Sequence, residues 1–254
     1  MTTHNFYESE RALSEYLLFH YCLDAEMAPA GISLAGAFDF PARCVSECVD
    51  VSRLPARARA LDLGCAVGRA SFELARRCSE VIAIDYSERF IKVACHLQCN
   101  GSLLFGCIEE GGLSRPCQAV ISAEIDRRRV LFERGDALDL RPGLGAFDVL
   151  LMANLLDRLR EPMKCLDQLP ALLQPGGQLI ITSPYTWSEE FTPRKNWLGG
   201  FERRGEKVRT LDTLKALLAP NFEFSFAQDM PFLIREHARK FQLCVAEASS
   251  WIRR

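Results

Sequence analysis

Short runs of consecutive apolar residues alternate with amphipathic stretches from about residue 60 onward. Apolar runs of about four to eight residues are typical of strands buried on both faces of a sheet, whereas apolar positions three or four apart indicate helices. The runs that predict strands are 60–63, 81–84, 130–133, 148–153, 179–182, 222–227 and 241–248. The stretches that predict helices are 69–78, 88–99, 161–173 and 210–218.

This alternation predicts an α/β fold of the Rossmann-like type, with a mostly parallel sheet and helices on both of its faces. In such sheets ligands bind beyond the carboxyl ends of the strands, where the strand order reverses. Polar residues that directly follow the predicted strands are therefore the first candidates for a binding site.

The first sixty residues follow a helical pattern instead. In 10–21 apolar side chains recur at helical spacing, 43–51 predicts a second helix, and 29–41 predicts a loop between them. We expect one structural domain overall, in which residues 1–58 form a helical lid segment on a core of residues 59–254. Insertions are expected at about 100–129 and 184–206, and no role for 100–129 follows from the sequence.

One strand–turn–helix segment, 61–69, has the composition of a cofactor-binding turn. Gly64 and Gly68 let the backbone approach a ligand closely, and the helix start offers free N–H groups. A dinucleotide site would require glycine at the positions that Ala66 and Arg69 occupy, so a nicotinamide oxidoreductase is disfavoured. A carboxylate just before the turn, as Asp62 provides, suits a cationic cofactor better than a diphosphate.

The segment resembles motif I of the class I S-adenosylmethionine-dependent methyltransferases, with Ala66 where a second glycine is usual. The resemblance continues in order through residues 60–183. The later matches are Asp85 after the second strand, Asp136 after the third, Asn154 after the fourth and 173–177 before the fifth. It implies a Rossmann-like methyltransferase sheet with an antiparallel C-terminal strand, and S-adenosylmethionine as the cofactor.

The resemblance also implies roles in cofactor binding. Asp85 would accept both ribose hydroxyls, Asp136 would contact the adenine amine, and Asn154 would lie near the methyl group. The complete set of implied cofactor-binding residues is Asp62, Gly64, Cys65, Ala66, Gly68, Asp85, Tyr86, Asp136, Ala137 and Asn154. The alternatives are that the aspartates cap helices or form turns and that Asn154 is an ordinary residue at a strand end.

Outside the core, the chain resembles one subgroup, the 5-thiohistidine (4-mercaptohistidine) N-methyltransferases of ovothiol biosynthesis. The segments that carry this resemblance are 6–9, 13–21, 40–45, 182–201 and 231–240. It implies methyl transfer to the imidazole N-π of 5-thiohistidine, which gives ovothiol A and S-adenosylhomocysteine. Members are often fused behind an iron-dependent sulfoxide synthase, so such a module, in the same or a neighbouring chain, is an expected partner.

The subgroup resemblance supplies candidates for acceptor binding and catalysis. The candidates for substrate binding are Tyr7, Tyr16, Tyr185, Trp187 and Arg194, and the candidates for catalysis are Asn154, Tyr185 and His20. Aromatic rings can stack on the imidazole, Arg194 can pair with the amino-acid carboxylate, and His20 can accept a proton. Packing is the alternative for the lid residues, and we expect Arg235, Glu236 and His237 to form structural ion pairs.

Two other functions stay open at this point. A methyltransferase of the same fold can act on another small molecule, because a fold does not fix a function. A non-catalytic S-adenosylmethionine-binding protein is the second alternative, and the acidic set at the strand ends argues against it.

Composition narrows the partners. The net charge of −2 and the pI near 6.1, without a long basic run, disfavour nucleic acid. No apolar run approaches a membrane span of about 18 residues, and the chain does not begin as a signal peptide does, so we expect a cytoplasmic protein without a membrane partner.

The eleven cysteines include no C-x-x-C pair. We therefore expect reduced, buried thiols and no metal site.

Overall fold

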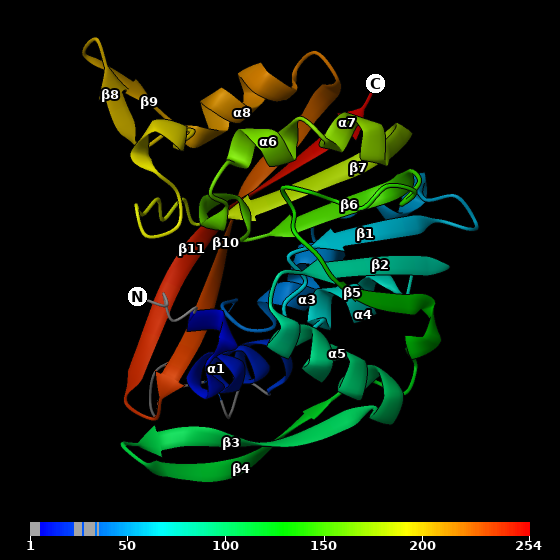
Figure 1. Ribbon diagram of the computed structural model, residues 1–254. Coiled ribbons are helices and arrows are strands. Elements are labelled where there is room, and N and C mark those ends of the chain that lie inside the picture. Colours follow the sequence, from blue (N-terminus) through cyan, green and yellow to red (C-terminus); the bar gives the residue numbers. More distant parts are fainter. Residues whose placement is uncertain (1–5, 23–26, 28–33, 35) are drawn as a thin grey trace.

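The strands of the main sheet lie in the order β10-β11-β7-β6-β1-β2-β5 in the computed structural model, which describes residues 6–22, 27, 34 and 36–254 (Figure 1). Strands β1, β2, β5, β6 and β7 are parallel, and β11 is antiparallel to both β7 and β10. Their bounds are β1 Arg59–Leu63, β2 Glu80–Asp85, β5 Val130–Arg134, β6 Phe147–Ala153, β7 Leu173–Ser183, β10 Phe222–His237 and β11 Lys240–Arg253. This confirms the predicted mostly parallel sheet with an antiparallel C-terminal strand.

The strand order reverses beside β1. The chain winds from β1 outward to β2 and β5, then returns to β6 on the other side of β1 and continues to β7. Loops that leave neighbouring strands at such a reversal diverge, so the crevice beyond the carboxyl ends of β1 and β6 is the natural ligand position.

Both faces of the sheet are covered, because successive side chains of a strand point to opposite faces. In β6, Val149 and Leu151 join the core under α3, α4 and α5, whereas Leu150 and Met152 join the core under α6, α7 and α8. The helix bounds are α1 Glu10–Tyr21, α3 Phe40–Ser46, α4 Arg69–Leu74, α5 Glu88–Asn100, α6 Pro162–Leu166, α7 Leu169–Leu172 and α8 Thr210–Leu218. Short 3-10 turns are η1 Phe6–Glu8, η2 Val51–Arg53, η3 Arg127–Arg129, η4 Leu156–Arg158 and η5 Arg194–Asn196.

Some predicted boundaries were wrong. The helix expected over 161–173 is two short helices, α6 and α7, followed at Leu173 by β7. Pro170 lies in the first turn of α7 and has no N–H to donate, so α6 cannot continue through it. The helix predicted over 43–51 begins earlier, at Phe40, and residues 29–33 and 35 of the loop predicted at 29–41 lie outside the described residues.

Helix α1 packs between the long β10–β11 hairpin and a smaller hairpin of β3 (Ser102–Glu110) and β4 (Leu113–Val120) (Figure 1). Ser9 caps its start through the N–H of Ala12. The Arg11 guanidinium bonds Glu236 of β10 at 2.5 Å, and the Ser14 hydroxyl donates to the Gly106 carbonyl of β3 at 2.7 Å. These contacts hold the lid helix from two sides.

The stretch 100–129, which the sequence left without a role, contains this β3–β4 hairpin. Its register places Cys107 and Cys117 on the same buried face, where they form a disulfide. The expectation that all cysteines are reduced was therefore wrong for this pair, because diagonal positions across a hairpin lie within reach of each other. The other nine cysteines, which all lie in the described part of the chain, form no disulfide.

A third hairpin, of β8 (Phe201–Arg203) and β9 (Glu206–Val208), precedes α8. Across the part of the chain that the structure describes, each helix is too short or too polar to span a bilayer.

Candidate active site

The predicted cofactor residues follow the carboxyl ends of four parallel strands. Gly64 follows β1, Asp85 ends β2, Asp136 follows β5 and Asn154 follows β6. Because these strands are parallel neighbours, the residues share one edge of the sheet. The structure therefore brings together positions that lie far apart in the sequence.

The turn after β1 has three residues in the left-handed region. Gly64 has φ 83°, Ala66 φ 48° and Gly68 φ 87°. A Cβ at Gly68 would lie 2.6 Å from Cζ of Phe132, so the position requires glycine for space as well as for its dihedral angle. Ala66 holds a conformation that L-residues seldom adopt, which points to a constraint on this turn.

Asp85 provides that constraint. Its carboxylate accepts the N–H of Ala66 at 2.8 Å through Oδ2 and the N–H of Ser87 at 2.8 Å through Oδ1. Burial raises its pKa, and the two backbone hydrogen bonds oppose that rise. The side chain is half-buried, so its remaining lone pairs can still accept hydroxyl donors from a ligand.

Asp62 is a buried carboxyl with one unsatisfied oxygen. Oδ2 accepts the Ser71 hydroxyl at 2.6 Å, and Oδ1 has no hydrogen-bond partner among the described residues. Burial raises the pKa of Asp62 to about 7. A cationic ligand group nearby would favour the charged carboxylate, so the site fits the ammonium of an amino-acid cofactor such as S-adenosylmethionine.

The remaining cofactor candidates lie around this edge with different exposures. Asp136 is half-buried and accepts the N–H of Leu138 at 2.8 Å, Ala137 is buried beside it, and Cys65 is buried in the first turn. Tyr86 is 61% exposed, with the Arg134 guanidinium 6.0 Å from its ring. Their cofactor contacts stay predictions.

Asn154 and Tyr185, two of the catalytic candidates, both have left-handed backbones, with φ 52° and 51°. The Asn154 N–H donates to the Thr182 hydroxyl at 3.1 Å, and that hydroxyl donates to the Asn154 amide oxygen at 3.0 Å. The Tyr185 hydroxyl donates to Glu247 of β11 at 2.9 Å. Positive φ at two polar residues after adjacent strands indicates that the surrounding structure fixes their direction.

An acidic residue that sequence reasoning missed supports this arrangement. Asp157, in η4, is fully buried and accepts the Ser183 hydroxyl at 3.1 Å and the N–H of Thr186 at 2.9 Å. The same Ser183 hydroxyl accepts the Tyr185 N–H at 3.0 Å. The only sequence signal was a carboxylate three residues past Asn154.

Tyr7 and Tyr16 of the lid segment lie above this edge. Their ring centroids are 6.0 Å apart, Tyr16 lies 4.8 Å from the Phe90 ring, and Tyr7 lies 6.2 Å from the Phe191 ring. Burial raises the pKa of both hydroxyls, and the charge of Asp85 adds to the rise for each. The lid tyrosines therefore pack beside the residues of this edge, although substrate contact by the tyrosines stays a prediction.

His20 lies further along α1, beside the turn after β1. The neighbouring Tyr21 hydroxyl donates to the Val67 carbonyl at 2.7 Å. His20 is buried, its Nδ1 has no partner among the described residues, and burial together with the charge of Arg69 lowers its pKa to about 3. Its described ring contacts are with Tyr16 and its neighbours Phe19 and Tyr21, so a catalytic role stays a prediction.

Trp187 and Arg194 contact Thr210 and Trp197, not the residues at the end of the sheet. The Trp187 indole N–H donates to the Thr210 hydroxyl at 2.9 Å, and its ring stacks on Trp197 at 6.4 Å. The Arg194 side chain is exposed, with its guanidinium 5.2 Å from the Trp197 ring. The described contacts do not bring these two residues to Tyr185, and their substrate roles stay predictions.

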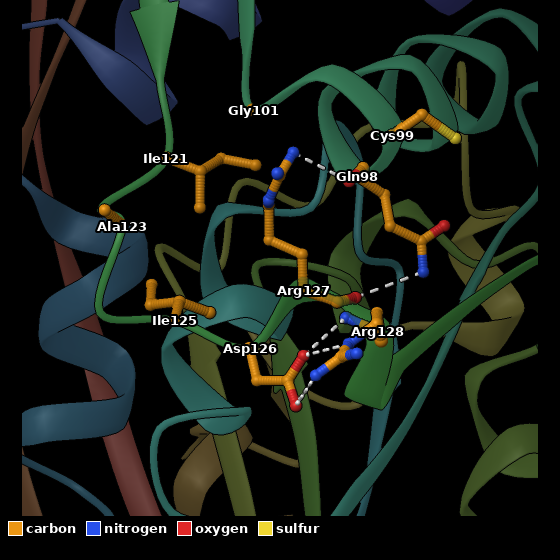
Figure 2. Close-up of a pocket in the computed structure, with 9 residues that line it drawn as sticks. All are labelled: Gln98, Cys99, Gly101, Ile121, Ala123, Ile125, Asp126, Arg127 and Arg128. Atoms are coloured by element: carbon orange, nitrogen blue, oxygen red, sulfur yellow. Dashed lines mark hydrogen bonds and ion pairs between the residues drawn. The ribbon is translucent and has the colours of Figure 1, made fainter.

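A surface hollow of about 610 Å³ lies away from the residues at the carboxyl ends of the strands (Figure 2). The residues that line it come from the end of α5 and from the loop before β5: Gln98, Cys99, Gly101, Ile121, Ala123, Ile125, Asp126, Arg127 and Arg128. The Arg127 guanidinium, which projects into this region, donates to the Leu97 and Gln98 carbonyls, and Arg128 pairs with Asp126. Because this hollow adjoins the start of β5 rather than its carboxyl end, it is separate from the site.

Comparison with known proteins agrees with this geometry. A family described as a methyltransferase domain matches residues 36–224. A ubiquinone biosynthesis O-methyltransferase of Xylella fastidiosa (strain 9a5c) is 32% identical over 126 residues, covering 50% of this chain and 42% of that protein. A demethylmenaquinone methyltransferase of Clavibacter sepedonicus is 29% identical over 123 residues, covering 48% of this chain and 40% of that protein. The chain thus spans less than half the length of these relatives.

Among solved structures, an S-adenosylmethionine-dependent methyltransferase from Methanosarcina mazei superposes with a TM-score of 0.52 at 18% identity. The match covers 79% of this chain and 94% of that one, and it shows the shared fold. With the family match, the strand order and the acidic residues at the strand ends, the chain belongs to the class I S-adenosylmethionine-dependent methyltransferases.

Proposed function

We propose that this protein methylates the imidazole N-π of 5-thiohistidine, giving ovothiol A and S-adenosylhomocysteine. The observation that carries the proposal is the resemblance of 182–201 to the thiohistidine subgroup, together with where that segment lies. It leaves the carboxyl end of β7 and contributes Tyr185 and Phe191, the latter against Tyr7 of the lid. A segment in this position is suited to select the acceptor.

The residues of the chain have two tasks in this reaction. When bound, S-adenosylmethionine supplies a methyl group already activated on its sulfonium. Asp62, Asp85 and Asp136 would hold the cofactor through its ammonium, ribose and adenine. Asn154 and Tyr185 would hold the acceptor nitrogen in line with the methyl group, because positioning dominates the rate of such a displacement.

Orientation must also prevent methylation of the neighbouring sulfur, which is a competing nucleophile. Tyr185 is suited to this because hydrogen bonds hold both its backbone and the hydroxyl at the tip of its side chain. Its backbone N–H donates to Ser183, and its hydroxyl donates to Glu247. A side chain held at two points loses little further entropy when an acceptor stacks on it.

Oxygen methylation of a quinone-type ring is a second candidate, favoured by the O-methyltransferase among the curated relatives. The first proposal also includes a sulfoxide synthase module that supplies the thiol, which is inferred from the resemblance. It includes a cytoplasmic location as well, which is inferred from the composition of the sequence.

Incubation of the protein with S-adenosylmethionine and either 5-thiohistidine, histidine or a catechol tests the proposals, with products identified by mass spectrometry and NMR. We expect a methyl group on the ring nitrogen of 5-thiohistidine and little reaction with histidine. Methylation of the catechol alone would support the second candidate, and cofactor binding without turnover of any acceptor would support a binding protein.

A further inference from the structure

Arg158 is a half-buried cation at the carboxyl edge of the sheet. It ends η4, four residues after Asn154, and its guanidinium carbon lies 4.7 Å from the centroid of the Phe191 ring. Among the residues that the structure describes, nothing accepts a hydrogen bond from this guanidinium or forms an ion pair with it. Arginine residues away from bulk water are usually paired, because an unpaired half-buried charge is unfavourable.

The guanidinium lies close enough to the lid for its charge to act on Tyr7. Burial raises the pKa of the Tyr7 hydroxyl, and the charge of Arg158 is the largest opposing influence. The same charge acts on the hydroxyl of Tyr16 and on the thiol of Cys244 in β11. Arg158 therefore lies between the lid, the segment after β7 and β11, where an acceptor would enter.

The nearby carboxylates are already engaged. Asp157 accepts the Ser183 hydroxyl and the Thr186 N–H, and Asp85 accepts the N–H groups of Ala66 and Ser87. Neither forms an ion pair with Arg158 in the described chain. The five N–H donors of this guanidinium are thus available to a ligand, and their planar fork matches the two oxygens of a carboxylate.

We propose that Arg158 binds a carboxylate of the methyl acceptor and so restricts acceptors to small carboxylate-bearing molecules. This deepens the proposed function, since it rests on the acceptor occupying this edge. The amino-acid carboxylate of 5-thiohistidine would be its ligand. Arg194, the sequence candidate for this task, is exposed and lies against Trp197 instead.

Three variants test the assignment. Arg158→Gln removes the charge, and Arg158→Lys keeps the charge without the fork. Arg203→Gln is the matched control, because Arg203 of β8 is an exposed arginine that also lies over an aromatic ring, that of Phe201. Two pairs of acceptors are compared, and the members of each pair differ only in a carboxylate: 5-thiohistidine and its decarboxylated amine, and 3,4-dihydroxybenzoate and catechol. Steady-state kinetics and calorimetric titration of the S-adenosylhomocysteine-saturated protein give the preference for the carboxylate-bearing member of each pair.

We expect the wild type to prefer the carboxylate-bearing partner by about 100-fold, as for a charged bidentate contact. Arg158→Gln should remove that preference by weakening only the carboxylate-bearing acceptor, and Arg158→Lys should retain part of it. Arg203→Gln should change the kinetics of neither acceptor by more than about threefold. An unchanged affinity for S-adenosylhomocysteine in Arg158→Gln shows that the fold and the cofactor site are intact.

The outcomes separate this inference from the proposed function. Methylation of 5-thiohistidine with the same KM in Arg158→Gln as in the wild type would overturn the role of Arg158 and leave the reaction standing. The opposite result is no turnover of 5-thiohistidine together with an Arg158-dependent preference for dihydroxybenzoate over catechol. It would overturn the proposed reaction and leave the role of Arg158 standing. A wild type without any carboxylate preference would also overturn the inference.

Discussion

The carboxylate of Asp85, at the end of β2, accepts the backbone N–H of Ala66 in the turn after β1 at 2.8 Å. One side chain thus fixes the turn and presents its remaining lone pairs to the cofactor position. The bond links two segments that are 19 residues apart in the sequence and contact through parallel strands. Any change at Asp85 should therefore affect binding and stability together.

We expect Asp85→Ala to weaken S-adenosylhomocysteine binding by at least about 30-fold and to lower the free energy of unfolding by about 1–3 kcal/mol. The second effect follows because the N–H groups of Ala66 and Ser87 lose their acceptors. Calorimetric titration and urea denaturation measure the two effects. Asp139→Ala, at an exposed position just after the neighbouring strand, is the control. Normal binding by Asp85→Ala would contradict the cofactor assignment.

Ala66→Gly should stabilise the protein by about 0.5–1 kcal/mol. Ala66 has φ 48°, where a Cβ is strained and glycine is not. Ala66→Val should destabilise it, because a β-branched residue tolerates this region poorly. Urea denaturation gives both values. Ala70→Gly within α4, which should be destabilising by about 1 kcal/mol, controls for the general effect of glycine. Equal losses for both glycine variants would show that the turn is unstrained.

Asp62 should make cofactor affinity depend on pH. Its pKa is about 7 in the unliganded protein, so the carboxyl is half protonated at neutral pH. A cationic ligand favours the carboxylate, and affinity should therefore rise as pH increases from 6 to 8, by up to about tenfold. Titrations with S-adenosylhomocysteine in buffers of different ionisation enthalpy detect the accompanying proton release. Asp62→Asn should bind more weakly with a flat profile, and a pH dependence that survives in this variant would exclude Asp62 as its source.

The sequence predicted the cofactor side of the site because those residues follow buried strands directly. Asp85 ends an apolar run and Asn154 follows another, and parallel strands bring such ends to one edge without further information. The position of Ser87 as the cap of α5 was visible for a similar local reason, since its hydroxyl accepts the N–H of Phe90.

The acceptor side was less predictable because its residues leave the strands on irregular segments. Arg158 is the last residue of one short 3-10 turn and Arg194 the first residue of another, and only tertiary packing decides which of them lies near the lid. The disulfide between Cys107 and Cys117 depends on the register of a hairpin, and the Gly111-Gly112 pair at its turn was the sequence signal that could have indicated it. Local patterns therefore located the edge of the sheet but not the direction of the loops above it.

His20 should make the protein sensitive to acid. Burial lowers its pKa from 6.5 to about 3, so the unfolded chain binds a proton that the folded protein does not take up between these values. Stability contributed by neutral His20 is complete above pH 6.5 and is lost as pH falls toward 3, with a loss of about 2 kcal/mol between pH 7 and pH 5. His20→Phe should reduce the pH slope of the free energy of unfolding by that amount. His96→Gln, at an exposed histidine on α5, is the control variant. Urea denaturation at pH 5, 6 and 7 measures all three proteins, and equal slopes for His20→Phe and the wild type would mean that His20 is accessible to protons in the folded state.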